Sequence, residues 1–203
     1  MKKKIRILFS GLSYLNHNYG AQGIAFPIIK KLNMYFDLEA VFAVSNKHYF
    51  EDKKLGEKYN YKVVLNKFKY EYMSEADFFD KILTMKYLLN NKLNNQKEQL
   101  ISEIIKCDAI IDLSGIEFIG NRDFIKKWSN YLDIIYLQEI SKKYNKLYLK
   151  YTKSYGPFSS SFYSNRVRKH LKELPALFIR GKENLKQVEE LDFQFLRTIV
   201  LLL

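Results

Sequence analysis

Short apolar runs of strand length alternate along this chain with longer segments in which apolar residues recur at helical spacing. Such alternation predicts βαβ units, in which helices connect parallel strands. The expected strands are 5–9, 38–44, 61–65, 109–113, 147–151, 176–179 and 198–203. The expected helices are 20–32, 76–105 with an interruption at 90–95, 124–144, 167–174 and 183–191. We therefore predict an α/β fold: a Rossmann-like parallel sheet with helices on both faces.

The domain organisation follows from composition. The chain has 203 residues, 47% of them hydrophobic, with 16 Tyr and 15 Phe but only 8 Gly and 3 Pro. This composition is typical of a packed globular fold rather than a disordered segment. Neither a Pro/Gly/Ser-rich linker nor an internal repeat divides the sequence. The simplest prediction is a single Rossmann-like domain over residues 1–203.

The formal net charge of +12 changes the expected partners. It favours an anionic partner, such as a nucleotide, a phosphorylated sugar, a nucleic acid or a lipid head group at a peripheral membrane contact. The alternative is that lysines are simply scattered over a solvated surface. Tyrosines interleave with lysines at 59–62 and 67–72, as in single-strand binding proteins. No nucleic-acid-binding module pattern is present and glutamates interrupt the stretch, so we do not expect nucleic-acid binding.

Cys107 is the only cysteine and lies in an apolar context, so we predict a buried thiol. A single cysteine excludes a disulfide framework and a cysteine-based zinc cluster, and we expect no metal. A reducing, cytoplasmic location fits this cysteine usage. The start of the chain superficially resembles a signal peptide, but its apolar run breaks at Ser10-Gly11, which favours a first strand. No segment reaches the roughly 20 apolar residues that would span a bilayer.

Ligands of open parallel sheets bind beyond the carboxyl ends of the strands, so the residues that follow predicted strands are the candidate site. Asn16, Asn18 and Gly20 follow the first strand and precede a helix. Backbone N–H groups at such a helix start form an anion or hydroxyl site. Asn18 has two interpretations, namely contact with a ligand and capping of the helix.

The second candidate segment follows the strand at 109–113. Asp112 lies near the strand end, where a carboxylate can act as a base toward a sugar hydroxyl. Its alternative role is to accept hydrogen bonds from the backbone of the next loop. Ser114 and Gly115 let the backbone approach a ligand closely.

The third and fourth candidate segments carry the strongest pattern. Ser154, Gly156 and Pro157 form a small-residue turn after a strand, a basic helix containing Arg166 follows, and Arg180 ends the next strand. Arginine binds carboxylate and phosphate groups in a planar, bidentate manner. An arginine that follows an apolar strand is difficult to explain as an ordinary surface residue. These residues predict a cationic pocket for a phosphorylated ligand.

The ordered set of these segments resembles the polysaccharide pyruvyl transferase family. The resemblance runs from about residue 5 to residue 191 and rests on Asn18–Ala21, Asp112–Gly115, Ser154–Phe158 and Ile179–Arg180. It implies a fold like that of the two-Rossmann (GT-B) glycosyltransferases. It also implies transfer of a pyruvyl group from phosphoenolpyruvate to a sugar or glycolipid acceptor of a surface polysaccharide, with no cofactor. Arg166 and Arg180 would then supply positive charge, and Asp112 would be the base.

The chain also departs from the family pattern. Gly181 and Asn184 stand where the family usually has Glu and Ser, and 193–200 lacks the family's Pro-Asp. We expect this chain to lack the family's second Rossmann-like domain, so that the sequence resembles an N-terminal half. A separate C-terminal half or a second copy of the chain would be its partner.

No residue is a convincing candidate for the acid that protonates phosphoenolpyruvate, so we expect little turnover by the chain alone. The alternative functions are a GT-B glycosyltransferase fragment that uses a nucleotide sugar and a non-enzymatic protein that binds anions or nucleic acid. The apolar tail at 198–203 is expected to pair as an edge strand or to lie at a subunit contact.

Overall fold

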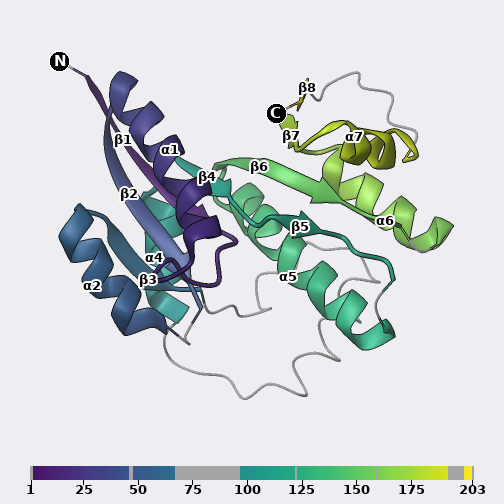
Figure 1. The fold of residues 1–203 in the computed structure, drawn as a ribbon, viewed down its shortest axis with the longest axis horizontal. Helices are drawn as coiled ribbons and strands as arrows, with labels where there is room; N and C mark the ends of the chain where they lie inside the picture. The colour runs from purple at the N-terminus through teal and green to yellow at the C-terminus, as the bar shows by residue number, and fades with distance from the viewer. Residues whose placement is uncertain are drawn as a thin grey trace. The chain divides into compact units, whose positions relative to one another are not determined.

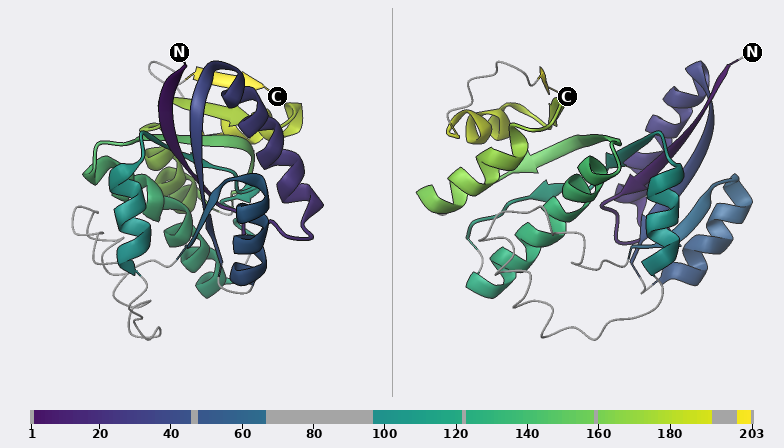
Figure 2. Two further views of the ribbon diagram at one scale, coloured as in Figure 1. Left: turned by 90° about the vertical axis from the view of Figure 1, so that its left-hand side faces the viewer. Right: turned by 180° about the vertical axis from the view of Figure 1, so that it is seen from behind.

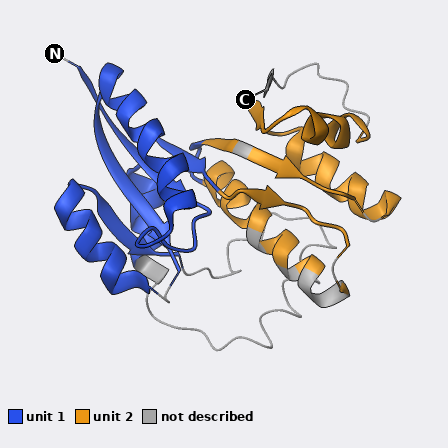
Figure 3. Cartoon of the chain, in the orientation of Figure 1, with its two compact units in different colours: residues 1–68, 94–113, 144–147 blue, residues 69–93, 114–143, 148–203 orange. Residues whose placement is uncertain are grey.

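The computed structural model describes residues 2–45, 48–66, 97–121, 123–158, 160–191 and 199–202. The chain divides into two compact units (Figure 3). Unit 1 comprises residues 1–68, 94–113 and 144–147, and unit 2 comprises 69–93, 114–143 and 148–203. In both units parallel strands alternate with helices (Figure 1). The prediction of an α/β, Rossmann-like fold is confirmed.

Unit 1 is built around four parallel strands in the order β3-β2-β1-β4. Its elements are β1 (Lys3–Ser10), α1 (Tyr19–Tyr35), β2 (Phe36–Val44), α2 (Tyr49–Tyr59), β3 (Lys62–Leu65), α4 (Lys97–Lys106) and β4 (Ala109–Asp112). Figure 2 shows α1 and α2 on one face of these strands and α4 on the other. Because all four strands run in the same direction, their carboxyl ends share one edge of the sheet.

The core of unit 1 forms where the strands turn apolar. β1 begins with exposed lysines and is buried from Ile7 to Ser10. The rings of Phe9 and Phe42 stack with their centroids 5.0 Å apart between neighbouring strands. Helices cover both faces of this sheet, so side chains on both sides of a strand are buried. This explains the near-continuous apolar runs of β1 and β2.

Ion pairs attach α4 to the strands of unit 1. The Glu103 carboxylate is only 2% exposed, accepts from Lys62 Nζ at 2.6 Å and forms a further ion pair with Arg6. Arg6 also pairs with Glu39 at 2.5 Å. Burial alone would raise the pKa of Glu103, but hydrogen bonds from Lys62 and Arg6 outweigh burial and lower it. The carboxylate therefore stays charged at neutral pH.

Unit 2 contains β5 (Ile116–Glu117), α5 (Phe124–Lys143), β6 (Leu147–Tyr155), α6 (Ser161–Leu171), β7 (Ala176–Ile179), α7 (Lys182–Glu189) and β8 (Ile199–Leu202). The strands pair in parallel in the order β6-β7-β8, with β5 also paired to β6. The predicted pairing of the apolar tail is thus confirmed. Aromatic side chains join α5 to α6: the ring of Trp128 lies 5.3 Å from those of Tyr131 and Tyr163.

Several boundaries differ from those predicted. Helix α2 and the short strand β5 were not predicted, and β6 extends four residues beyond the expected end at Tyr151. Helix α6 begins at Ser161 rather than at Val167, because the Ser160 side chain caps its first turn through Tyr163 N at 3.3 Å. The part of the expected helix at 76–105 that precedes Lys97 lies outside the described residues.

A glycine in α2 is required by a close backbone approach. A Cβ atom on Gly56 would lie 2.6 Å from the carbonyl oxygen of Tyr61, which is closer than real contacts allow. Helix α2 ends at Tyr59, and the next residue, Asn60, is in the left-handed region at φ 56°. The chain then turns back, and Tyr61 N donates to Gly56 O at 3.0 Å. By contrast, a Cβ on Gly23 in α1 would meet nothing within 4 Å.

Gly56→Ala should therefore lower the free energy of unfolding by about 1–3 kcal/mol, because backbone must move to admit the methyl group. The matched control, Gly23→Ala, should raise it by about 0.5–1 kcal/mol, because alanine is the better helix former where space is free. Urea unfolding of both variants measures this. Equal stability of Gly56→Ala and the wild type would contradict the geometry.

The predicted burial of Cys107 is confirmed. Its side chain is 2% exposed, its Sγ donates to the Ile104 carbonyl at 3.1 Å, and burial raises the pKa of the thiol to about 11. Only the thiolate reacts with disulfide reagents, and little thiolate forms at mildly alkaline pH.

We expect native Cys107 to react with an aromatic disulfide reagent at least about a hundredfold more slowly than a free cysteine at pH near 8. In denaturant the same residue should react at the rate of the free amino acid. Fast labelling of the folded protein would show that the thiol is accessible and would contradict its burial.

Candidate active site

An irregularity in β6 brings two lysines to the same face of unit 2. Lys150 pairs with Leu177 of β7, and Lys153 pairs with Ile179, so three steps along β6 match two along β7. Residues three apart in a regular strand face opposite sides, whereas one extra residue in a bulge returns them to the same side. Both lysine side chains are fully buried.

A buried glutamate receives both ammonium groups. Glu117 Oε2 lies 2.8 Å from Lys150 Nζ, and Glu117 Oε1 lies 2.9 Å from Lys153 Nζ. Lys153 Nζ also donates to Ser114 Oγ at 2.5 Å, and the Ser114 hydroxyl donates to Glu117 Oε1 at 2.5 Å. We name Ser114, Glu117, Lys150 and Lys153 the buried ion cluster. Charges withdrawn from water in this way must be paired and hydrogen-bonded, as they are here.

The ends of β6 and β7 place an exposed arginine beside the buried ion cluster. Arg180 N donates to Lys153 O at 2.9 Å, and an Arg180 Nη donates to Ser154 Oγ at 2.9 Å. The Ser154 backbone N–H is itself fixed by Gly115 O at 3.0 Å. Among the residues that the structure describes, Arg180 forms no ion pair with a carboxylate. Its guanidinium is thus oriented by a hydroxyl and keeps donors for an anion.

Two glycines border this strand end. Gly156 has φ +77°, its N–H donates to Glu117 O at 3.2 Å, and a Cβ would lie 3.0 Å from Gln187 Oε1. Gly181 has φ +78° and precedes α7 without a side-chain cap. The carbonyl of Pro157 accepts from Gly120 N at 2.8 Å. Positive φ explains why glycine occupies positions 156 and 181.

The structure thus places Ser114, Gly115, Ser154, Gly156 and Arg180 in one network, together with Pro157 at the adjoining turn. Arg166 is half-buried on α6 and is not among the described partners of Arg180, which are Lys153, Ser154 and Asn184.

The remaining predicted residues belong to unit 1. Asn18 caps α1, since its Oδ1 accepts from Ala21 N at 3.1 Å, so the capping interpretation is shown. Gly20 lies in the first turn of α1 and has room for a side chain, because a Cβ atom there would lie 3.6 Å from Asn18 Oδ1. Asp112 is 4% exposed at the end of β4, opposite Ser10 in the strand register.

A buried acid that sequence reasoning missed accepts hydrogen bonds from the backbone of the loop after β1. Asp52 on α2 is fully buried, and its Oδ1 accepts from Leu15 N at 2.9 Å and Asn16 N at 2.6 Å. The backbone N–H groups of Leu15 and Asn16 are therefore engaged within the fold. A shallow cavity of about 270 Å³ adjoins the loop and is lined by Asn16, Glu51, Lys54, Leu55 and Lys58.

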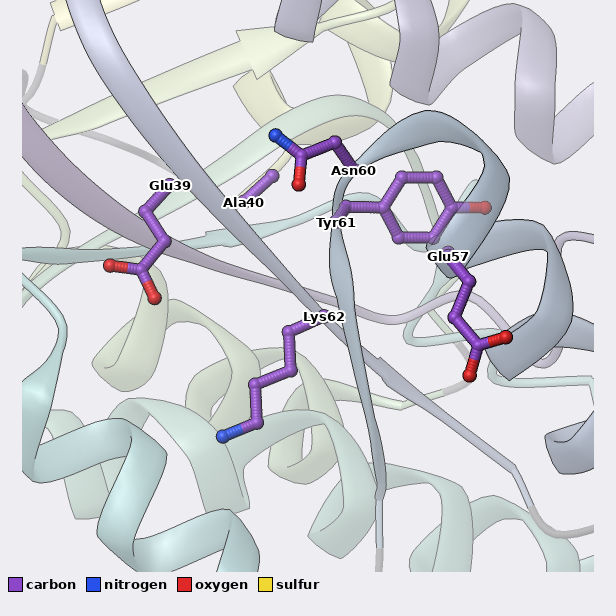
Figure 4. Close-up of a pocket in the computed structure, with 7 residues that line it drawn as sticks. Glu39, Ala40, Glu57, Asn60, Tyr61 and Lys62 are labelled. Carbon is purple, nitrogen blue, oxygen red and sulfur yellow. The ribbon is translucent and has the colours of Figure 1, made fainter.

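A second cavity of unit 1, of about 280 Å³, lies away from the strands' carboxyl ends (Figure 4). It is lined by Glu39, Ala40, Gly56, Glu57, Asn60, Tyr61 and Lys62. Glu39 already pairs with Arg6, and Lys62 already pairs with Glu103. These charged groups are thus engaged within the fold, and we do not assign the cavity a ligand.

Three potential metal ligands meet where α5 and the end of α6 adjoin: Glu139 lies on α5, His170 on α6 and Glu173 just beyond α6. The ligand atoms of Glu139, His170 and Glu173 lie within 4.8 Å of one another. The Lys142 ammonium, however, lies 2.9 Å from Glu139 Oε1 and also pairs with Glu173. Burial alone would raise the pKa of Glu139, but hydrogen bonds from His170 and Lys142 lower it. A lysine therefore already pairs with both carboxylates, and we interpret the group as an ion network joining the two helices.

Comparisons with known proteins identify no relative. No family model matches the chain, and the comparisons with curated proteins and with solved structures found no match. Among the residues described, no helix is long and apolar enough to cross a bilayer. The fold and the site define an α/β, Rossmann-like protein with a cationic strand end in unit 2.

Sequence reasoning assigned no role to Glu117, Lys150 or Lys153. A signal was present, since two lysines and a glutamate fall within or beside strands of largely buried residues. Charged residues in such positions are rare unless they are paired. The bulge that brings the two lysines together has no sequence signature of its own.

Glu117→Gln should lower the free energy of unfolding by about 3–5 kcal/mol, because it removes the carboxylate that both buried ammonium groups share. As a control, Glu183→Gln removes a carboxylate of the same kind from an exposed ion pair with Lys186. That change should leave the free energy of unfolding nearly unchanged. Urea unfolding distinguishes them, and a loss below about 1 kcal/mol for Glu117→Gln would contradict the role of the buried ion cluster.

Proposed function

We propose that unit 2 binds a small carboxylated or phosphorylated molecule at the carboxyl ends of β6 and β7. The observation that supports this most is the Arg180 guanidinium, which is exposed, held by Ser154 and without a carboxylate partner among the described residues. An arginine fixed in this way presents its remaining N–H groups as a planar fork that matches carboxylate and phosphate.

Neighbouring groups support anion binding at the same strand end. Ser114 and Ser154 are half-buried hydroxyls, and the Lys153 ammonium donates to that of Ser114. Gly181, next to Arg180, is the N-cap residue of α7, and the first N–H groups of this helix receive no side-chain cap. Free N–H groups and the helix dipole favour an anion at this end.

We propose phosphoenolpyruvate as the ligand, because it carries both a carboxylate and a phosphate and because the motifs resemble those of polysaccharide pyruvyl transferases. In that reaction two sugar hydroxyls add to the enol carbon, its methylene takes up a proton, and phosphate leaves. Arg180 would stabilise the negative charge of the donor. In the absence of an assigned acid for the methylene carbon, we expect binding with little turnover.

Nucleic-acid binding through the tyrosine-rich segment at 59–62 is not supported. Tyr61 is 9% exposed and its ring packs against Phe42 with centroids 4.9 Å apart. Lys62 is engaged by Glu103. A stacking platform needs exposed rings beside free cations, which these two residues do not provide. The other tyrosine-rich segment, at 67–72, lies outside the described residues.

Isothermal titration of the protein with phosphoenolpyruvate tests the proposal. We expect Arg180→Met to weaken binding by at least about tenfold, since a charge-assisted bidentate contact is lost. Arg180→Lys should be intermediate, because it keeps the charge and loses the fork. The matched control is Arg168→Met, because Arg168 lies in the same unit and also donates to a neutral side chain, Asn165 Oδ1, at 2.5 Å.

Equal weakening by Arg168→Met, or no weakening by Arg180→Met, would contradict the site. Titration with a nucleoside-diphosphate sugar and with pyruvate separates the ligand classes. Tighter binding of the nucleotide sugar would replace the pyruvyl transferase proposal with that of a glycosyltransferase. Release of phosphate in the presence of a sugar diol is expected only for the pyruvyl transferase reaction.

A further inference from the structure

Lysines and two exposed apolar side chains gather where three elements of unit 1 meet. β1 begins at Lys3, which is opposite Phe36 at the start of β2, and α1 ends at Tyr35 immediately before it (Figure 1). Lys2 Nζ donates to the carbonyl of Asn33 at 2.5 Å, which ties the chain start to the end of α1. We define the basic tip as Lys2, Lys3, Lys4, Lys30, Lys31, Met34 and Tyr35.

The charge of the basic tip is not neutralised within unit 1. All five lysines are exposed, and none forms an ion pair with any residue that the structure describes. Asp37, opposite Lys4 in the strand register, is the acidic residue beside them. By contrast, Arg6 and Lys62 in the same unit are both paired with Glu103. The five lysines therefore carry exposed positive charge near the start of β1 and the end of α1 and are not part of an ion network.

Apolar groups lie within this positive surface. Met34 and Tyr35 are 59% and 60% exposed, and Lys31 Nζ lies 5.7 Å from the centre of the Tyr35 ring. Tyrosine is favoured at the water–lipid boundary because its ring is apolar and its hydroxyl group can hydrogen-bond with water. Methionine is flexible and adapts to irregular apolar surroundings. Long lysine side chains can lie along such a boundary with their ammonium groups at the head-group level.

We propose that the basic tip docks unit 1 onto the surface of an anionic lipid bilayer. Clusters of four to eight basic residues are the usual size for attraction to anionic lipids. Exposed Met34 and Tyr35 would enter the head-group region among them. A nucleic acid fits this surface less well, because the cations are lysines without an arginine fork and Lys31 lies over the Tyr35 ring. The proposal is independent of the anion site in unit 2.

Co-sedimentation with vesicles tests it. The wild type should bind vesicles of phosphatidylcholine with about one quarter phosphatidylglycerol, and should not bind pure phosphatidylcholine. The Lys3→Gln, Lys30→Gln and Lys31→Gln triple variant should lose about a hundredfold in partition coefficient, since each lysine near such a surface contributes roughly fivefold. Added salt should weaken wild-type binding.

The control variant removes the same charge elsewhere in unit 1, by changing the exposed Lys53, Lys54 and Lys58 of α2 to glutamine. It should bind nearly as well as the wild type, and an equal loss would overturn the proposal in favour of unspecific attraction by net charge. Met34→Ser with Tyr35→Ser should remove the binding that persists in high salt.

All the changed side chains are exposed, so we expect every variant to fold. Thermal unfolding of each variant checks this. Wild-type binding to neutral vesicles with equal affinity would overturn the proposal. So would binding of an oligo(dT) strand that is tighter than vesicle binding and depends on the same three lysines, because the tip would then be a nucleic-acid surface.

Discussion

The buried carboxylate of Glu117 and the bulge in β6 form the constraint on which unit 2 depends. Without the extra residue between the pairs Lys150–Leu177 and Lys153–Ile179, the two lysines would face opposite sides of the sheet. With it, both ammonium groups reach one carboxylate that is closed off from water. The same cluster holds Ser114, and Lys153 O fixes the backbone of Arg180. The cationic strand end is therefore an extension of a buried ion cluster and not a set of independent surface residues.

The two units differ in which groups occupy the hydrogen-bonding atoms at the carboxyl ends of their strands. In unit 1 the loop after β1 is closed from within, because Asp52 accepts from the N–H groups of Leu15 and Asn16 and Asn18 caps α1. In unit 2 the corresponding strand end leaves a guanidinium oriented by a neutral hydroxyl. A carboxylate that already satisfies backbone donors competes with an incoming anion, whereas an arginine held by serine does not. This contrast directs the proposed function to unit 2.

The sequence predicted most of the fold because buried parallel strands are continuous apolar runs. Ala176–Ile179 has the predicted bounds, and Arg180 follows the strand as expected. Helix α2 was missed because its residues are mostly charged and show no apolar periodicity. Its buried residues are Asp52 and Gly56, which do not form an apolar pattern. The extension of β6 and the buried ion cluster were missed for a related reason. A bulge depends on pairing with β7, and a single sequence does not record that register.

The central claim is that an anion binds at the carboxyl ends of β6 and β7. Backbone ¹⁵N–¹H NMR during titration with phosphoenolpyruvate tests it most directly, because it reports position without requiring turnover. The account predicts that the amide signals of Ser154, Gly156 and Gly181 shift together and saturate, while those of Leu15 and Asn16 remain in place. Saturating shifts confined to the loop after β1, with the signals of unit 2 unmoved, would contradict it.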